Sequence, residues 1–351
     1  MNRDEAKGIA LIGTVLVDEL LPILKPGQLT CTDANEFVPV SEMRGEIIQY
    51  SVGGMALNVA VNLAKLSGDF PISIIGKIGS DHRADLIRQT MRDNSLDTEW
   101  LIVDHTRSTS HTTVIYIEMP DRKVERLFRH TFGAMGSFAP ADIELAKLQG
   151  YKFAMFGYGL LLPLLDLEDD HYGTRLGRIM AKTRQYGVKT AIDFVSPDRE
   201  NLFRFKRYQK SIAYADMVII NDDQAQSLTE QSSPDKACMA LVEEYKCGLG
   251  IVHCGAIGPN YAYSKESGLV VQPNYHVAPE EIAGNAGAGD AFSAAILHAL
   301  YHDWSIREAL AFAAAAAAKS LSHASCTGAM QNENEILKYM ETRATKLQDR
   351  I

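Results

Sequence analysis

Short apolar segments alternate with helix-forming segments along most of this chain, and that alternation limits its possible folds more than any other feature. Apolar runs of strand length lie at 8–13, 72–79, 152–159, 189–194, 216–221 and 248–254. Helical patterns lie between and after them, at 53–68, 80–96, 173–186, 204–214, 222–230, 234–247, 290–302, 305–323 and 332–349. The alternation predicts an α/β fold, with a mostly parallel central sheet covered by helices on both faces.

Two stretches do not fit this alternation. Residues 15–50 contain three prolines and only short apolar runs, which indicates edge strands rather than core. Residues 111–130 have the pattern of a hairpin, with two strand-like runs around the polar turn MPDRK. Together, 15–50 and about 109–131 predict a small β-sheet lid attached to the α/β body.

Composition and charge argue against several classes of protein. The net charge of −9 gives no indication of a nucleic-acid or membrane surface. The polar N-terminus has no signal-peptide core, and the apolar run at 312–319 is too short to span a bilayer. The five cysteines lack metal-ligand spacing, which favours reduced thiols in a cytoplasmic protein. Neither an HExxH metal motif nor a G-x-S-x-G nucleophile motif occurs.

The sequence GNAGAGDAF at 284–292 places many small residues directly before a helical pattern. Such a loop lets backbone N–H groups converge, and the helix dipole adds positive charge, so a phosphate fits there. It is neither a Walker A motif nor a dinucleotide fingerprint. A tight loop in which Asp290 is an ordinary acid of the first helical turn explains the pattern equally well. If a phosphoryl group moves to an alcohol here, Asp290 could accept the hydroxyl proton.

Two further elements carry polar groups suited to a polyol. Gly53 and Gly54 open a helix that presents Asn58, whose amide both donates and accepts hydrogen bonds. Asp18 follows the first strand, where ligands of open α/β sheets collect. Each element taken alone also fits a purely structural role.

In their order and separation, Gly13 and Asp18, then GG…N at 53–58, then GAGD at 287–290 resemble the ribokinase-like (PfkB) family of carbohydrate and nucleoside kinases. The resemblance covers nearly the whole chain. It implies a single domain over 1–351, an α/β body with a small β-sheet lid. It also implies transfer of the ATP γ-phosphoryl group to a hydroxyl of a small substrate. Mg²⁺ would be held through water and the ATP phosphates, near Asn221, with no direct protein ligand.

The resemblance assigns roles residue by residue. Asp290 matches the catalytic base, and the anion hole matches Gly287, Ala288 and Gly289. The substrate-binding set matches Asp18, Gly53, Gly54 and Asn58. The nucleotide site matches Asn221, Gly255, Gly258, Gly328 and Ala329.

The chain departs from the family pattern at several positions. Gln224 replaces the acid of the N-x-x-E motif, and Gly284 and Asn285 replace an Asp-Thr pair whose Asp helps hold a monovalent cation. The cation requirement is open, and our hypothesis is that activity depends little on K⁺. Tyr158 stands where a ribokinase has Glu; we place it in the substrate-binding set, and it argues against ribose. In DFVSP, at 193–197, the Asn and Arg of the sugar-kinase D-x-N-x-R motif are absent.

The sequence therefore predicts a cytoplasmic, ATP- and Mg²⁺-dependent sugar kinase that binds neither nucleic acid nor membrane. One alternative is a nucleoside kinase of the adenosine-kinase type, with Phe37, Tyr50 or Phe132 stacking on the base. Another is a regulatory protein with weak catalysis on the same scaffold. Because lid strands often pair in this family, the resemblance also implies a homodimer through the lid. The sequence does not identify the sugar or the hydroxyl that is phosphorylated.

Overall fold

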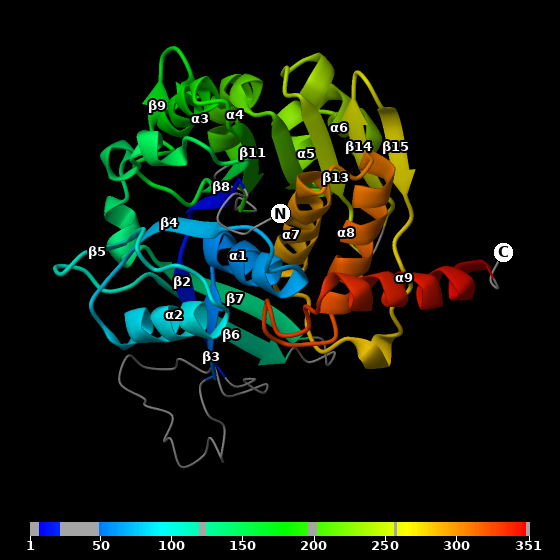
Figure 1. Cartoon of the computed structure of the whole chain (residues 1–351), viewed down its shortest axis with the longest axis horizontal. Helices are drawn as coiled ribbons and strands as arrows, with labels where there is room; N and C mark the ends of the chain where they lie inside the picture. Colours follow the sequence, from blue (N-terminus) through cyan, green and yellow to red (C-terminus); the bar gives the residue numbers. More distant parts are fainter. Residues whose placement is uncertain (1–6, 22–48, 119–123, 196–201, 256–257, 349–351) are drawn as a thin grey trace.

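A nine-stranded sheet forms the centre of the part of the protein that the structure, a computed structural model, describes: residues 7–21, 49–118, 124–195, 202–255 and 258–348 (Figure 1). Its strands, in spatial order, are β15 (Gly268–Gln272), β14 (Asn260–Ser264), β13 (Leu249–His253), β12 (Met217–Asn221), β11 (Lys189–Phe194), β8 (Phe153–Gly159), β1 (Ile9–Gly13), β4 (Ile72–Ile78) and β5 (Leu101–Val103). The pairs from β13 to β5 are parallel, and β14 and β15 are antiparallel additions at one edge. The predicted mostly parallel α/β fold is confirmed.

Helices cover both faces of this sheet. They are α1 (Met55–Leu66), α2 (His82–Asp93), α3 (Arg175–Gln185), α4 (Leu202–Ser211), α5 (Asp222–Thr229), α6 (Pro234–Glu243), α7 (Ala288–Tyr301), α8 (Ile306–Ser320) and α9 (Glu333–Gln348). Buried strand side chains alternate between two cores. Ile9 and Leu11 of β1 pack with α1, α7 and α8, whereas Ala10 and Ile12 pack with α3 to α6. A strand with apolar side chains on both faces needs helices on both sides of the sheet, as the unbroken apolar runs predicted.

A small sheet of four strands lies beside the body (Figure 1). Its order is β3 (Gln49–Gly53), β2 (Leu16–Leu20), β6 (His111–Glu118) and β7 (Val124–Thr131). The predicted hairpin at 111–130 is confirmed as the antiparallel pair β6–β7. The ends of the predicted excursion 15–50 supply β2 and β3, and residues 22–48 lie outside the described residues.

The short strands at the sheet edges were missed in the sequence. Strands β5, β14 and β15 have three to five residues each, and the two-residue pair β9 (Glu168–Asp169) and β10 (Gly173–Thr174) is shorter still. Such strands depend on a neighbouring strand for their backbone hydrogen bonds, so their own patterns are weak. Among the described helices, none combines the length and the hydrophobicity of a membrane span.

Candidate active site

Helix α7 begins at the end of the glycine-rich loop, and its first turn carries Asp290. Its N-cap is Gly287, whose φ of 77° is left-handed. The first amides of a helix have no intrahelical acceptor. The amides of Ala288, Gly289 and Asp290 therefore give the N-terminus of α7 a partial positive charge. The loop packs closely on the segment after α8, since a Cβ on Gly287 would meet Cys326 and one on Gly284 would meet Ala324.

Asp290 is buried and held by two donors. Asn58 Nδ2 donates to Asp290 Oδ2 at 2.9 Å, and the Tyr158 hydroxyl donates to Oδ1 at 2.5 Å. Burial raises the pKa of Asp290 to about 6, and the hydrogen bonds from Tyr158 and Asn58 act in the opposite direction. A buried carboxylate whose pKa lies near neutrality is suited to take up a proton during a reaction.

The start of α1 is fixed by the turn that follows β1. Thr14 accepts hydrogen bonds from both first amides of α1, from Met55 N at its hydroxyl (2.9 Å) and from Ala56 N at its carbonyl (3.1 Å). Gly54 is the N-cap of α1, and this junction directs Asn58 toward α7. The second amide atom of Asn58, Oδ1, is buried without a partner among the described residues, and a bound hydroxyl could donate to it.

Asp18 of β2 lies close to this junction, and a Cβ on Gly53 would collide with its carboxylate. Burial and the neighbouring Asp290 raise the pKa of Asp18 to about 7. Asp193, at the end of β11, is also buried near Asp290, and both burial and that charge hold its pKa well above the usual range. The centre of the site is therefore acidic, and the charge of Asp290 disfavours ionisation of the neighbouring Asp18 and Asp193.

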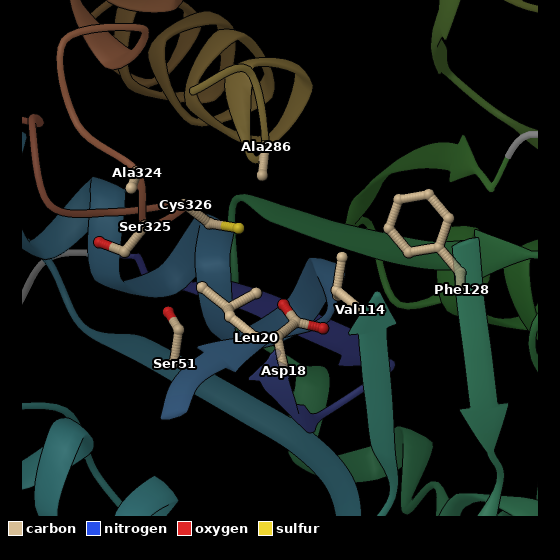
Figure 2. A pocket seen from close by; sticks show the side chains of 9 residues that line it. All are labelled: Asp18, Leu20, Ser51, Val114, Phe128, Ala286, Ala324, Ser325 and Cys326. Atoms are coloured by element: carbon tan, nitrogen blue, oxygen red, sulfur yellow. The ribbon is translucent and has the colours of Figure 1, made fainter. Parts of the chain in front are cut away.

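A small pocket opens between the small sheet and the loops before α7 and after α8 (Figure 2). Figure 2 shows Asp18, Ser51 and Ser325 supplying polar groups, with Ala286 and Cys326 on the side of the body. The remaining lining is apolar: Leu20, Val114, Phe128 and Ala324. The pocket has the mixed polar and apolar lining of a small-molecule site.

Asn221 and Gln224 form a capping box at the start of α5. Gln224 N donates to Asn221 Oδ1 at 2.8 Å, and Asn221 N donates back to Gln224 Oε1 at 3.1 Å. The other amide atom, Gln224 Nε2, donates to the carbonyl of Phe194 at 3.0 Å. A glutamate satisfies the capping box equally well, but it has no N–H for the Phe194 carbonyl. The departure from the family acid thus has a local structural reason.

We expect Gln224→Glu to lower the free energy of unfolding by about 1–3 kcal/mol at neutral pH, because the buried carboxylate would face a carbonyl oxygen. Urea denaturation measures this change. Gln226→Glu is the control on the same helix: its amide also donates to a carbonyl, that of Asp222 at 3.2 Å, but partial exposure lets water solvate the new charge. Equal unfolding midpoints for the two variants would show that burial of the Phe194 contact adds nothing to the loss.

The predicted nucleotide loop follows β13, whose His253 pairs in register with Asn221 of β12. Asn274 holds the loop, donating through Nδ2 to the carbonyls of Gly255 and Gly258. Burial lowers the pKa of His253 to about 4, so its imidazole is neutral. It packs against Phe292 and lies next to Gly289, so the ends of β12 and β13 border the glycine-rich loop.

Gly328 and Ala329 lie in the segment between α8 and α9. A Cβ on Gly328 would collide with the ring of His323. Lys65 of α1 donates to the carbonyl of Thr327 at 2.6 Å, which ties this segment to the helix that carries Asn58. Within the described residues, no group of three or more His, Cys, Asp or Glu side chains is arranged to hold a metal ion.

The model of the pfkB family of carbohydrate kinases matches residues 27–333. The chain belongs to this family. Among curated proteins, this pfkB kinase is 25% identical to the 5-dehydro-2-deoxygluconokinase of Lacticaseibacillus casei, over 83% of this chain and 86% of that protein.

Solved structures at lower identity support the fold of this pfkB kinase. A fructokinase with bound ATP from Xylella fastidiosa is 19% identical, with a TM-score of 0.74 over 96% of this chain and 99% of that one. An Escherichia coli protein solved with ATP and Mg²⁺ is 16% identical, with the same TM-score and coverage.

The structure brings the predicted substrate-binding residues and the predicted catalytic residues close to one another. Gly53 contacts Asp18, and both Asn58 and Tyr158 bind Asp290. Tyr158 contacts the carboxylate directly, which the sequence did not indicate. Four residues with no predicted role also lie here: Thr14, Asp193, His253 and Cys326. A polar residue at the carboxyl end of a strand was the available signal for Asp193 and His253.

Proposed function

We propose that this pfkB kinase transfers the γ-phosphoryl group of ATP to a hydroxyl of a small sugar, with Asp290 as the general base. The observation that carries the proposal is the placement of Asp290. Its carboxylate is buried in the first turn of α7, directly after a glycine-rich loop whose amides suit an anion. A proton acceptor and an anion site thus lie within one helical turn.

In the proposed reaction, the sugar lies between the small sheet and α1. Asp18, the Gly53–Gly54 backbone and Asn58 bind its hydroxyls, the buried Oδ1 of Asn58 acting as an acceptor. The hydroxyl oxygen forms a bond to the γ-phosphorus while the bond from that phosphorus to the bridging oxygen breaks and ADP leaves. The hydroxyl proton passes to Asp290, and the amides of 287–290 stabilise the charge on the phosphoryl oxygens.

The residues at the carboxyl ends of β12 and β13 fit a nucleotide. We assign ATP to Asn221, Gly255 and Gly258 on one side and to Gly328 and Ala329 on the other. Mg²⁺ would be held by the ATP phosphates and water near Asn221, with no direct protein ligand. Bound Mg²⁺ supplies charge neutralisation on the phosphates.

The relatives' names direct the choice of substrates to test. The curated relatives are kinases of 5-dehydro-2-deoxygluconate, so this sugar acid is the first substrate to try. A nucleoside is the second class, since Tyr50 and Phe132 of the small-sheet region are exposed rings; Phe37 lies outside the described residues. The third reading is a regulatory protein with weak catalysis.

An ADP-release assay over sugars, sugar acids and nucleosides tests the proposal. Fast release with one sugar or sugar acid is the expected result, together with a phosphorylated product by mass spectrometry. If only a nucleoside gave fast ADP release, the substrate would be a nucleoside and not a sugar. No release above the ATP-only rate with any of them would favour the regulatory reading.

We expect turnover to change little when K⁺ is replaced by tetramethylammonium. Gly284 supplies no carboxylate for a cation, and its backbone is held by the Leu321 carbonyl, which accepts from the amides of Ala283 (2.8 Å) and Gly284 (3.3 Å). Initial rates at constant ionic strength measure the effect, with sodium as a second comparison. A large loss in tetramethylammonium, restored by K⁺, would contradict the expectation.

We also propose that the small sheet acts as a lid and as the contact between two copies in a homodimer. The exposed rings of Tyr50, Phe128 and Phe132 give this region apolar surface. Sedimentation of the full chain, with and without substrate, tests the dimer.

A further inference from the structure

Both oxygens of the Asp290 carboxylate are already bound to protein donors. Asn58 reaches Oδ2 from α1, and Tyr158 reaches Oδ1 from the end of β8. The two residues lie far from Asp290 in the sequence, 232 and 132 positions before it. Two donors on separate elements fix the plane of the carboxylate, so it cannot rotate freely to meet a hydroxyl.

The Tyr158 hydroxyl is a donor that stays protonated. Burial and the neighbouring charges of Asp290 and Asp193 raise the pKa of Tyr158 well above its usual value. The ring packs against the core that contains α1 and α7, which restricts where the hydroxyl can go. Tyr158 therefore presents one O–H to the carboxylate throughout the pH range in which the kinase would work.

We propose that Tyr158 is a positioning residue that orients the Asp290 carboxylate and keeps it ionised, and that it acts on the sugar only through Asp290. This inference rests on the proposed function, in which Asp290 is the base. It changes the role expected for Tyr158, which the sequence placed among the sugar contacts.

The surroundings of Asp290 explain why such a donor is needed. The groups that face it are Asp18 of β2, Asn58 of α1, Tyr158 of β8, Asp193 of β11 and Cys326 after α8. Burial favours a protonated Asp290, and a protonated carboxyl cannot accept the substrate's proton. The hydrogen bonds from Tyr158 and Asn58 favour the ionised form.

Tyr158→Phe tests the inference through the pH dependence of turnover. Removing the donor raises the pKa of Asp290, so the acidic limb of the kcat profile should move to higher pH, by about one unit. Turnover at pH 9 should recover more than turnover at pH 6, and KM for the sugar should stay close to that of the unmodified protein. Replacement of Tyr158 by 3-fluorotyrosine, a stronger donor, should move the limb to lower pH and retains the packing of the ring.

Tyr208→Phe is the matched control. Tyr208 is a buried tyrosine in the core on the other face of the sheet, and its hydroxyl also donates to an aspartate, Asp166. Its substitution should leave the acidic limb in place. Thermal unfolding of each variant shows whether it is folded under the assay conditions.

Three outcomes would overturn the inference: an unmoved limb in Tyr158→Phe with a raised KM for the sugar, an equal loss of turnover at every pH, or an equal shift in Tyr208→Phe. The first outcome would make Tyr158 a sugar contact. Failure of the proposed function has a different signature, since Asp290→Asn would then retain turnover. An inactive Asp290→Asn with an unmoved limb in Tyr158→Phe removes only the inference.

Discussion

Replacing Asp290 with Asn is expected to lower turnover by about a thousandfold while nucleotide binding is retained. The expected size is that of a lost general base, typically 10²–10⁴-fold. The amide keeps the volume of the side chain, and its one oxygen can still accept from Tyr158, but its N–H2 group can accept neither the Asn58 donor nor the hydroxyl proton. Single-turnover kinetics measure the chemical step, and calorimetry with an ATP analogue measures binding.

The same substitution should stabilise the protein, and the gain should depend on pH. Burial raises the pKa of Asp290 from 3.8 to about 6, so the folded state binds this proton more tightly than the unfolded state. The stability that this bound proton contributes is fully present below about pH 4, and it is lost as the pH rises through 6. The variant should therefore exceed the unmodified protein in melting temperature by more at pH 8 than at pH 4.

Asp303→Asn is the control for this prediction. Asp303 follows the other end of α7, and its exposed carboxylate binds Lys152 at 2.9 Å. Turnover in this variant should be nearly unchanged. Near-normal turnover in Asp290→Asn would exclude Asp290 as the base, whatever the effect on stability.

The sequence was sufficient for the body of the fold because buried parallel strands have strong local patterns. Strands β1, β4, β8, β11, β12 and β13 each carry apolar side chains to both cores, and their helices show clear periodicity. The edge strands β14 and β15 were missed because a strand with one exposed face and few residues depends on its partner.

The sequence predicted which residues lie together at the candidate site but not how they contact one another. Asn58 and Asp290 are 232 positions apart, so their hydrogen bond follows from the packing of α1 on α7. Tyr158 was assigned from the resemblance, at the position of a ribokinase Glu, and only the fold shows its hydroxyl on Asp290. The sequence showed Gln224 only as a replacement for the acid of the N-x-x-E motif, and the fold shows its amide on the Phe194 carbonyl. Contacts of this kind depend on tertiary packing and leave no local pattern.

Gly287→Ala should lower turnover by about 10²–10³-fold, because it disturbs the amides that hold the phosphoryl group. Two effects combine at this position. The φ of 77° is strained for any residue with a Cβ, and the added Cβ would lie 2.5 Å from Cys326 Cα and 2.6 Å from its carbonyl oxygen. Both contacts are with the backbone, so the loop before α7 or the segment after α8 must move.

Gly268→Ala separates strain from collision. Gly268 also has a left-handed φ, 65°, but it begins β15 in the hairpin with β14, where a Cβ would have no neighbour within 4 Å. It should lose about 1–2 kcal/mol of stability from the left-handed backbone and keep its turnover. If Gly287→Ala loses no more turnover than Gly268→Ala at matched folded fractions, the position of the 287–290 amides does not limit the reaction. A large loss in Gly287→Ala alone, with ATP still bound, would place those amides at the transition state, because strain alone is common to both variants.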